Sequence, residues 1–149
     1  MADFKLKGRK MEKAQLIILK AELANDPLSR GYSGMTNAQL VTSLNTKDRP
    51  HNKDILTGQE LFYNTVQSEY ASKTDFQKLQ WLSFCGIGEI DPFNATVQAL
   101  VISIFGAGSD TVANLVAARV ELISRAQEGG ISVVTLEDVE KTQNNEDLQ

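Results

Sequence analysis

Hydrophobic residues recur at helical spacing along most of this chain. From Lys10 the apolar positions fall three and four residues apart and predict a first helix. That helix should end at Asp26-Pro27, because the residue before a proline avoids the α conformation. The apolar stripe of this helix contains Met11, Ala14, Ile18 and Ala21, widened by Leu16, Leu19 and Leu23.

Polar residues that cap helices mark the starts of the later segments. The predicted helices are 37–45 after Thr36, 57–71 opened by the capping box of Thr57 and Glu60, 75–85 after Thr74, 92–105 after Asp91, 110–128 after Ser109, and a short last helix from Thr135. The helix over 92–105 is the most apolar of these, so we expect it to lie at the centre of the core.

Two segments do not follow the helical pattern. TKDRPHNKD, residues 46–54, is polar and contains a proline, which predicts a loop and the one candidate subdomain boundary. Ile131–Val134 is a β-branched run that forms either one strand or an extended segment docked on the core.

The predicted fold class is therefore all-α, a compact bundle of six or seven helices with at most one short strand segment. The expected domain organisation is a flexible N-terminal arm over 1–9, a single α-helical domain over 10–141 and a flexible acidic tail over 142–149.

Composition narrows the classes of function. The chain has 149 residues with a net charge of −4, which argues against a dedicated nucleic-acid-binding protein. Its basic residues gather near the start, at Lys5, Lys7, Arg9, Lys10 and Lys13, and form either a solvated arm or a contact to a phosphate backbone. We find no run long enough to span a membrane and no signal peptide, so we expect synthesis in the cytoplasm and no membrane partner.

Few residues are candidates for catalysis. Cys85 and His51 are the only cysteine and histidine, and they form a nucleophile–base pair only if the fold brings them together. The apolar sequence around Cys85 and the polar sequence around His51 favour a buried thiol and an exposed imidazole instead. One Cys and one His do not make the usual zinc ligand set. We expect no enzyme, no metal, no cofactor and no small-molecule substrate.

The segment FGAGSD, residues 105–110, has two interpretations. Glycines before a helix can present backbone N–H groups to a phosphate. Alternatively, Gly106 and Gly108 supply positive φ in a tight turn and Ser109 caps the helix, which is the interpretation we favour.

The segment WLSFC, residues 81–85, is typical of a core. However, Trp81, Phe84 and Phe76 cannot all point the same way on one helix. We therefore expect part of this cluster, including Trp81, to face a partner protein.

A sequence pattern links the chain to a known family. The segment AELANDPLSRGYSGMTNAQLVTSLN resembles the pattern ELxxDPLxRGYxGM…LN of small proteins encoded by tailed bacteriophages and prophages. LTGQELF, DPF at 91–93 and FGAGSDTVANLVAARVELISRAQEGG at 105–130 follow in the same order, so the resemblance spans roughly residues 14–134. It implies a late-gene, virion-associated protein and brings no catalytic residue or cofactor. The chain beyond Glu137 lies outside the pattern.

The loop NDPLSRGYSG, residues 25–34, is the main candidate site. Pro27 fixes φ, Gly31 and Gly34 permit positive φ, and Arg30 and Tyr32 are residue types enriched in interface hot spots. One interpretation makes Arg30, Tyr32 and Pro27 part of a contact with another subunit. The other has Arg30 and Tyr32 tie neighbouring helices together within the monomer, with Arg30 bonding helix C-terminal carbonyls.

The function that these observations predict is a structural component of a tailed bacteriophage particle. We expect it at the capsid surface, the head–tail junction or the tail, in several copies that contact one another and other virion proteins. The alternative is a free cytoplasmic phage protein, either an assembly chaperone or a host-directed inhibitor.

Overall fold

The computed structural model describes residues 10–145 and divides them into two compact units. The terminal unit contains the residues up to Arg49 and those from Leu122, and the inserted unit contains Pro50–Glu121. The boundary falls inside strands β1 (Lys47–Asn52) and β4 (Val120–Ser124), which pair with each other. The predicted arm over 1–9 lies outside the described residues, as does the 146–149 part of the predicted tail.

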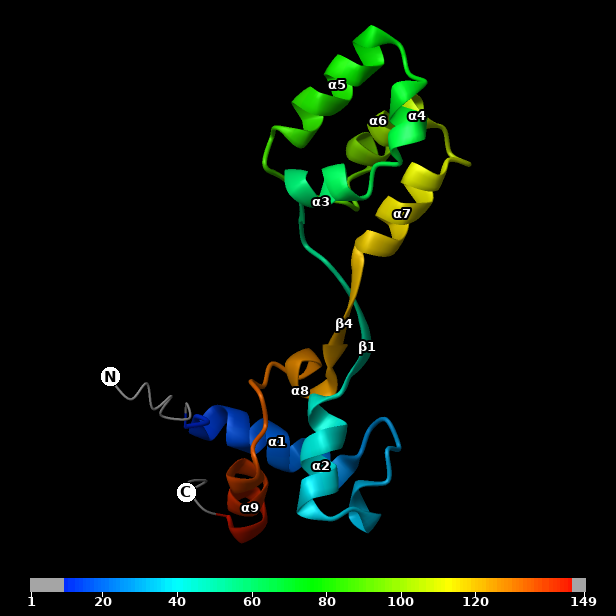
Figure 1. The fold of residues 1–149 in the computed structure, drawn as a ribbon. Coiled ribbons are helices and arrows are strands. Elements are labelled where there is room, and N and C mark those ends of the chain that lie inside the picture. The colour runs from blue at the N-terminus through cyan, green and yellow to red at the C-terminus, as the bar shows by residue number, and fades with distance from the viewer. Residues whose placement is uncertain (1–9, 146–149) are drawn as a thin grey trace, which may run out of the picture. The chain divides into compact units, whose positions relative to one another are not determined.

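Helices from both ends of the described chain build the terminal unit (Figure 1). Its helices are α1 (Lys13–Asn25), the 3-10 turn η1 (Tyr32–Gly34), α2 (Asn37–Asn45), α8 (Arg125–Glu128) and α9 (Leu136–Asn144). Helix α1 packs against α9, and α2 packs against α8 and α9. The core between them is aliphatic, with Leu16, Leu19, Leu44 and Val139 all fully buried.

The segment Ile131–Val134 takes the second of its two predicted forms, an extended stretch docked on this core. Ile131 and Val134 are buried, and no strand is assigned to the segment. The side-chain amide of Asn45 pairs with the backbone of Val134 in both directions, at 2.7 and 2.9 Å. An Asn side chain thus supplies the hydrogen bonds that a partner strand would otherwise provide.

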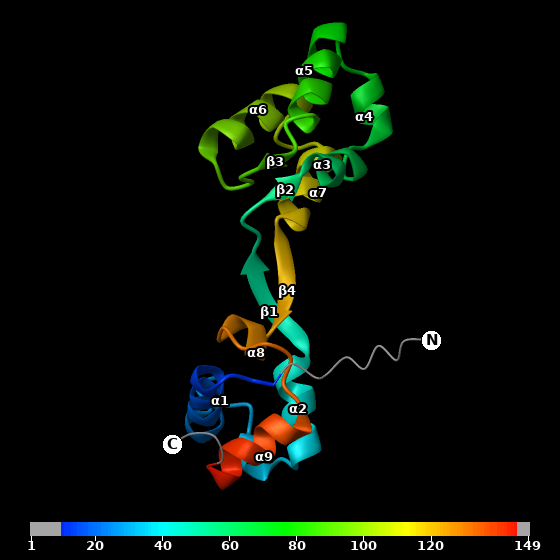
Figure 2. The same ribbon diagram turned by 90° about the vertical axis from the view of Figure 1, so that its left-hand side faces the viewer.

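The inserted unit has its own core. Its elements are β2 (Leu56–Thr57), α3 (Gly58–Tyr63), α4 (Gln67–Ala71), α5 (Asp75–Cys85), β3 (Glu89–Ile90), α6 (Ala95–Phe105) and α7 (Asp110–Ala118). Strands β2 and β3 are antiparallel, with Leu56 opposite Ile90, and lie beside α3 (Figure 2). Leu56, Leu61 and Trp81 are the most buried hydrophobic side chains among those described in this unit.

The all-α prediction is wrong. The described residues form nine α-helices and four strands in two small antiparallel sheets, with 59% of residues helical. The predicted loop over 46–54 contains β1, although the segment is polar and includes Pro50. A two-stranded sheet leaves one edge of each strand unpaired, so it tolerates a proline that cannot donate a hydrogen bond.

Two long predicted helices are each divided. The helix predicted over 110–128 becomes α7, β4 and α8, and the one predicted over 57–71 becomes α3 and α4. Val116, Val120 and Ile123 are all β-branched and satisfy helical spacing. Pairing with β1 draws Val120 and Ile123 into a strand, whereas Val116 stays in α7.

The predicted central helix over 92–105 is also corrected. It begins at Ala95 after an Asn94 cap, because the Asp91 carboxylate accepts from the N–H of Phe93 and holds a turn instead. Only one face of α6 is buried, through Val101, Ile104 and Phe105, while Ile102 is 43% exposed. Helix α6 therefore forms one wall of the core and is not its centre.

Candidate functional site

The loop after α1 is shaped by the carboxylate of Asp26. Asp26 ends α1 in the left-handed conformation with φ 39°, and its oxygens accept from the backbone N–H groups of Arg30, Gly31 and Tyr32 at 2.7, 2.7 and 3.3 Å. Desolvation opposes ionisation here, but the three N–H donors outweigh it and hold the pKa of Asp26 below its usual value. Gly31 has the positive φ expected of it, at 81°, whereas Gly34 is not among the residues with positive φ.

Arg30 ties this loop to the end of α2. Its Nη1 donates to the carbonyl oxygen of Ser43, in the last turn of α2, at 2.8 Å. Its Nη2 bonds the carboxylate of Asp48 at 2.8 Å, and the Arg30 side chain is only 14% exposed. The bond to Ser43 is of the kind that the second interpretation gave to Arg30, a contact with a helix C-terminal carbonyl, whereas the ion pair with Asp48 was not part of that interpretation.

Tyr32 lies inside the terminal unit. It is 3% exposed, and its hydroxyl donates to Oε1 of Glu22 at 2.9 Å. Arg125 binds both oxygens of the same carboxylate at 2.8 and 2.9 Å and also bonds Glu128, which in turn pairs with Arg49. Burial, together with the bond to Glu22, raises the pKa of Tyr32. A connected polar network thus joins η1, α1 and α8.

The four residues predicted as an interface are placed differently from one another. Pro27 is exposed, Arg30 is half-buried, and both Tyr32 and Trp81 are buried. An interface anchor has to be accessible before binding. Because the side chains of Tyr32 and Trp81 are buried, neither can be such an anchor. Trp81 stacks edge-on to Phe105 with ring centroids 4.8 Å apart, and its indole N–H donates to Oγ1 of Thr65 at 3.1 Å.

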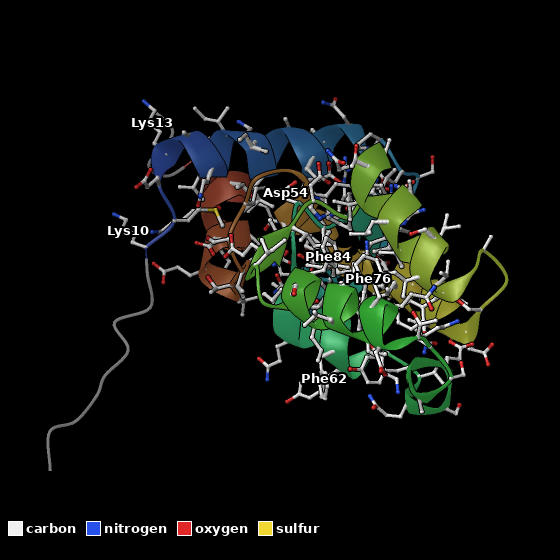
Figure 3. All side chains as sticks on the ribbon, turned by 90° about the horizontal axis from the view of Figure 1, so that it is seen from above. Lys10, Lys13, Asp54, Phe62, Phe76 and Phe84 are labelled. Carbon is white, nitrogen blue, oxygen red and sulfur yellow. The ribbon has the colours of Figure 1, made fainter. Side chains whose placement is uncertain are left out.

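Helix α5 has a second apolar face, opposite to Trp81 and Phe84. Phe76, Leu79 and Leu82 follow each other at intervals of three and are 74%, 64% and 50% exposed. Figure 3 labels Phe76 and Phe84 on α5 and Phe62 on the neighbouring α3. We call Phe76, Leu79 and Leu82 the outer face of α5. The sequence predicts that part of the aromatic cluster on this helix faces a partner protein. That prediction names Trp81 for the role, whereas the exposed residues are those of the outer face of α5.

The N-terminus of α7 is occupied by a side chain of the protein itself. The carboxylate of Glu69, on α4, accepts from the N–H groups of Asp110 and Thr111 at 2.9 and 2.8 Å and from the Thr111 hydroxyl. The Thr111 hydroxyl bond is the main cause of the lowered pKa of Glu69. Gly106 has φ 89° and Ser109 caps Val112, so FGAGSD forms a turn and a cap, but Gly108 does not have the positive φ expected of it. No local sequence pattern predicted this role of Glu69.

Cys85 and His51 are not brought together. His51 faces Glu121, with Nδ1 3.5 Å from the carboxylate and both side chains about half exposed. Cys85 packs against the core of the inserted unit, where burial raises the pKa of its thiol to about 11. Among residues 10–145 no three His, Cys, Asp or Glu side chains gather into a set that could hold a metal ion. Nor does any helix in that range have the length and apolar character to cross a membrane.

Comparison of the chain with models of protein families, with curated proteins and with solved structures found no match.

Proposed function

We propose that this protein is a structural component of a tailed bacteriophage particle and acts through protein–protein contacts in several copies. The observation that carries the proposal is the outer face of α5. The large apolar side chains of Phe76, Leu79 and Leu82 are exposed to solvent on one face of the helix, while its opposite face packs against the core. An exposed apolar face of this kind is typical of an interaction surface.

The resemblance of residues 14–134 to small phage proteins supports the same role, as does an acidic net charge of −4 that does not suit nucleic-acid binding. The role requires no catalysis and no cofactor. In the particle, the outer face of α5 would be covered by a neighbouring subunit. Fully burying a Phe or Leu side chain contributes about 1.5–3 kcal/mol, so three such side chains form an effective contact.

The experiment is mass spectrometry of purified particles from a phage that encodes the protein. We expect the polypeptide among the virion proteins at a fixed copy number. In a second arm, Phe76→Ser should leave the isolated protein folded, because the ring is 74% exposed, and should lower the amount in particles. Val133→Ser is the matched control, since Val133 is 73% exposed but lies away from α5 in sequence and in the other unit.

The alternative makes the opposite forecast. A free cytoplasmic assembly chaperone or host-directed inhibitor would be abundant in infected cells and absent from purified particles. That result would overturn the structural role.

A further inference from the structure

The inserted unit contains a small apolar pocket that the proposed contact on α5 does not use. Its volume is about 180 Å³. Aliphatic side chains from β2, β3, α6 and α7 line it, among them Leu56, Ile90, Val101 and Leu115. Leu56 and Ile90 are cross-strand partners, so the β2–β3 pair brings both side chains into the same wall.

Among residues 10–145, only two polar side chains line the pocket, Gln98 and Arg119. The side-chain amide of Gln98 already donates to the carbonyl of Pro92 at 3.3 Å. The guanidinium of Arg119 stacks on the ring of Phe93, with Cζ 4.6 Å from the ring centroid. In the part of the chain that the structure describes, no carboxylate lines the pocket.

Arg119 differs from the other arginines of the described chain. Arg30 pairs with Asp48, Arg49 with Glu128, and Arg125 with Glu22 and Glu128. Within residues 10–145, Arg119 is the arginine that has no carboxylate partner. Its guanidinium lies against the Phe93 ring, and its N–H donors remain available to an anion.

We propose that this pocket binds a small apolar monocarboxylate. Its ring or short alkyl chain lies among the aliphatic side chains, and its carboxylate pairs with Arg119. The volume sets the size, because an apolar cavity of about 150 Å³ accommodates benzene while drug-sized ligands need about 300 Å³ or more. The charge of Arg119 determines the head group of the ligand, because one cation without a carboxylate partner in an apolar wall complements one negative charge. The molecule is a bound ligand and undergoes no reaction.

The first test uses the unmodified full chain and three probes. Methyl NMR signals of the pocket residues are followed during titration with 3-phenylpropanoate, with the neutral 3-phenylpropan-1-ol and with acetate. We expect the acid to bind about tenfold more tightly than the alcohol, as one charge-assisted hydrogen bond contributes on that scale. Acetate should leave the pocket signals unchanged. Equal affinity for acid and alcohol, no shift with either, or an acetate effect as large as that of the acid would each overturn the proposal.

The second test removes the charge. Arg119→Gln should reduce the affinity for 3-phenylpropanoate to that for the alcohol, without changing the affinity for the alcohol. Lys78→Gln is the matched control, because Lys78 is a cation stacked on an aromatic ring of the same unit, with Nζ 5.9 Å from the Tyr70 centroid, and does not line the pocket. Undiminished binding of the acid to Arg119→Gln contradicts the assignment of its partner.

Discussion

At the residue scale, Gly58 is the glycine of the described chain with the least room for a side chain. A Cβ built there would lie 1.9 Å from the backbone oxygen of Cys85, a distance that real Cβ atoms do not reach. This close approach lets the start of α3 contact the end of α5. The glycine is therefore required by packing between two backbones, since its φ is not positive.

We predict that Gly58→Ala destabilises the protein by about 1–3 kcal/mol, the usual range for an overpacked site. Gly108→Ala, in the same unit, should change the free energy of unfolding by less than about 0.5 kcal/mol, since a Cβ there meets nothing within 4 Å. Urea unfolding of both variants measures the difference. Equal stability of the two would mean that α3 and α5 do not approach in this way.

Asp26 gives a pH-dependent prediction. Its pKa is lowered in the folded protein, so its contribution to stability is complete above its unfolded pKa of about 4 and is lost as pH falls through the folded value. Asp26→Asn, which has one acceptor oxygen in place of two, should be less stable than the parent at pH 7. The difference in stability between the variant and the parent should disappear at acidic pH. Urea midpoints from pH 7 to pH 2 measure it, with Glu140→Gln as the control. A gap that is constant with pH contradicts this role of the carboxylate.

At the element scale, α7 depends on a cap that comes from a different helix. Glu69 on α4 accepts hydrogen bonds from the first N–H groups of α7. The Thr111 hydroxyl, which donates to Glu69, also accepts from the N–H of Val66 at 3.0 Å. Thr111 is fully buried, so no water can replace the Glu69 carboxylate as the partner of its hydroxyl.

We predict that Glu69→Ala lowers the urea midpoint of the protein and increases amide exchange at the start of α7. Glu69→Gln should have a smaller effect, because the amide oxygen still accepts one N–H. Glu89→Ala, an exposed carboxylate of the same unit, should leave both measurements unchanged. If exchange at Asp110 and Thr111 is the same in all three variants, Glu69 does not hold the helix start.

The elements also show which local signals in the sequence are reliable. Thr36, Thr57, Thr74, Ser109 and Thr135 all cap the helices predicted after them, because a cap is decided within four residues. The sequence-based predictions of helix ends and strands were wrong where contacts with a segment distant in sequence determine the structure. The strand β4 depends on β1, some 70 residues earlier in the chain, and no local pattern carries that information.

The candidate site was predicted only in part, for the same reason. The loop over 25–34 was recognised as unusual, and its Arg30 contact was one of two stated alternatives. Tyr32 and Trp81 were assigned by residue type, which does not reveal which way a side chain points. The Glu22–Arg125 contact joins residues 103 positions apart and had no sequence signal.

At the scale of the whole molecule, the described chain has two hydrophobic clusters that share no residue. Each is centred on fully buried leucines, Leu44 in the terminal unit and Leu61 in the inserted unit. A substitution that destabilises the core of one unit should therefore leave the other unit folded.

We predict that Leu44→Ala and Leu61→Ala each cost about 2–5 kcal/mol, the usual range for a large core truncation. Hydrogen exchange measured by mass spectrometry should increase in residues 10–49 and 122–145 for the first variant, and in residues 50–121 for the second. The exposed substitution Leu79→Ala controls for a leucine lost without a cavity. Faster exchange throughout the chain in both variants would indicate a single cooperative unit.

The discontinuous terminal unit has a consequence for synthesis on the ribosome. Helices α1 and α2 are complete once Asn45 is made, but α9 begins at Leu136, about ninety residues later. At roughly 5–20 residues per second, the nascent chain exposes the inward faces of α1 and α2 for roughly five to twenty seconds before α9 can cover them. During that interval the inserted unit, whose residues are contiguous, can fold first. The nascent N-terminal helices are then the part of this protein that a ribosome-associated chaperone would bind.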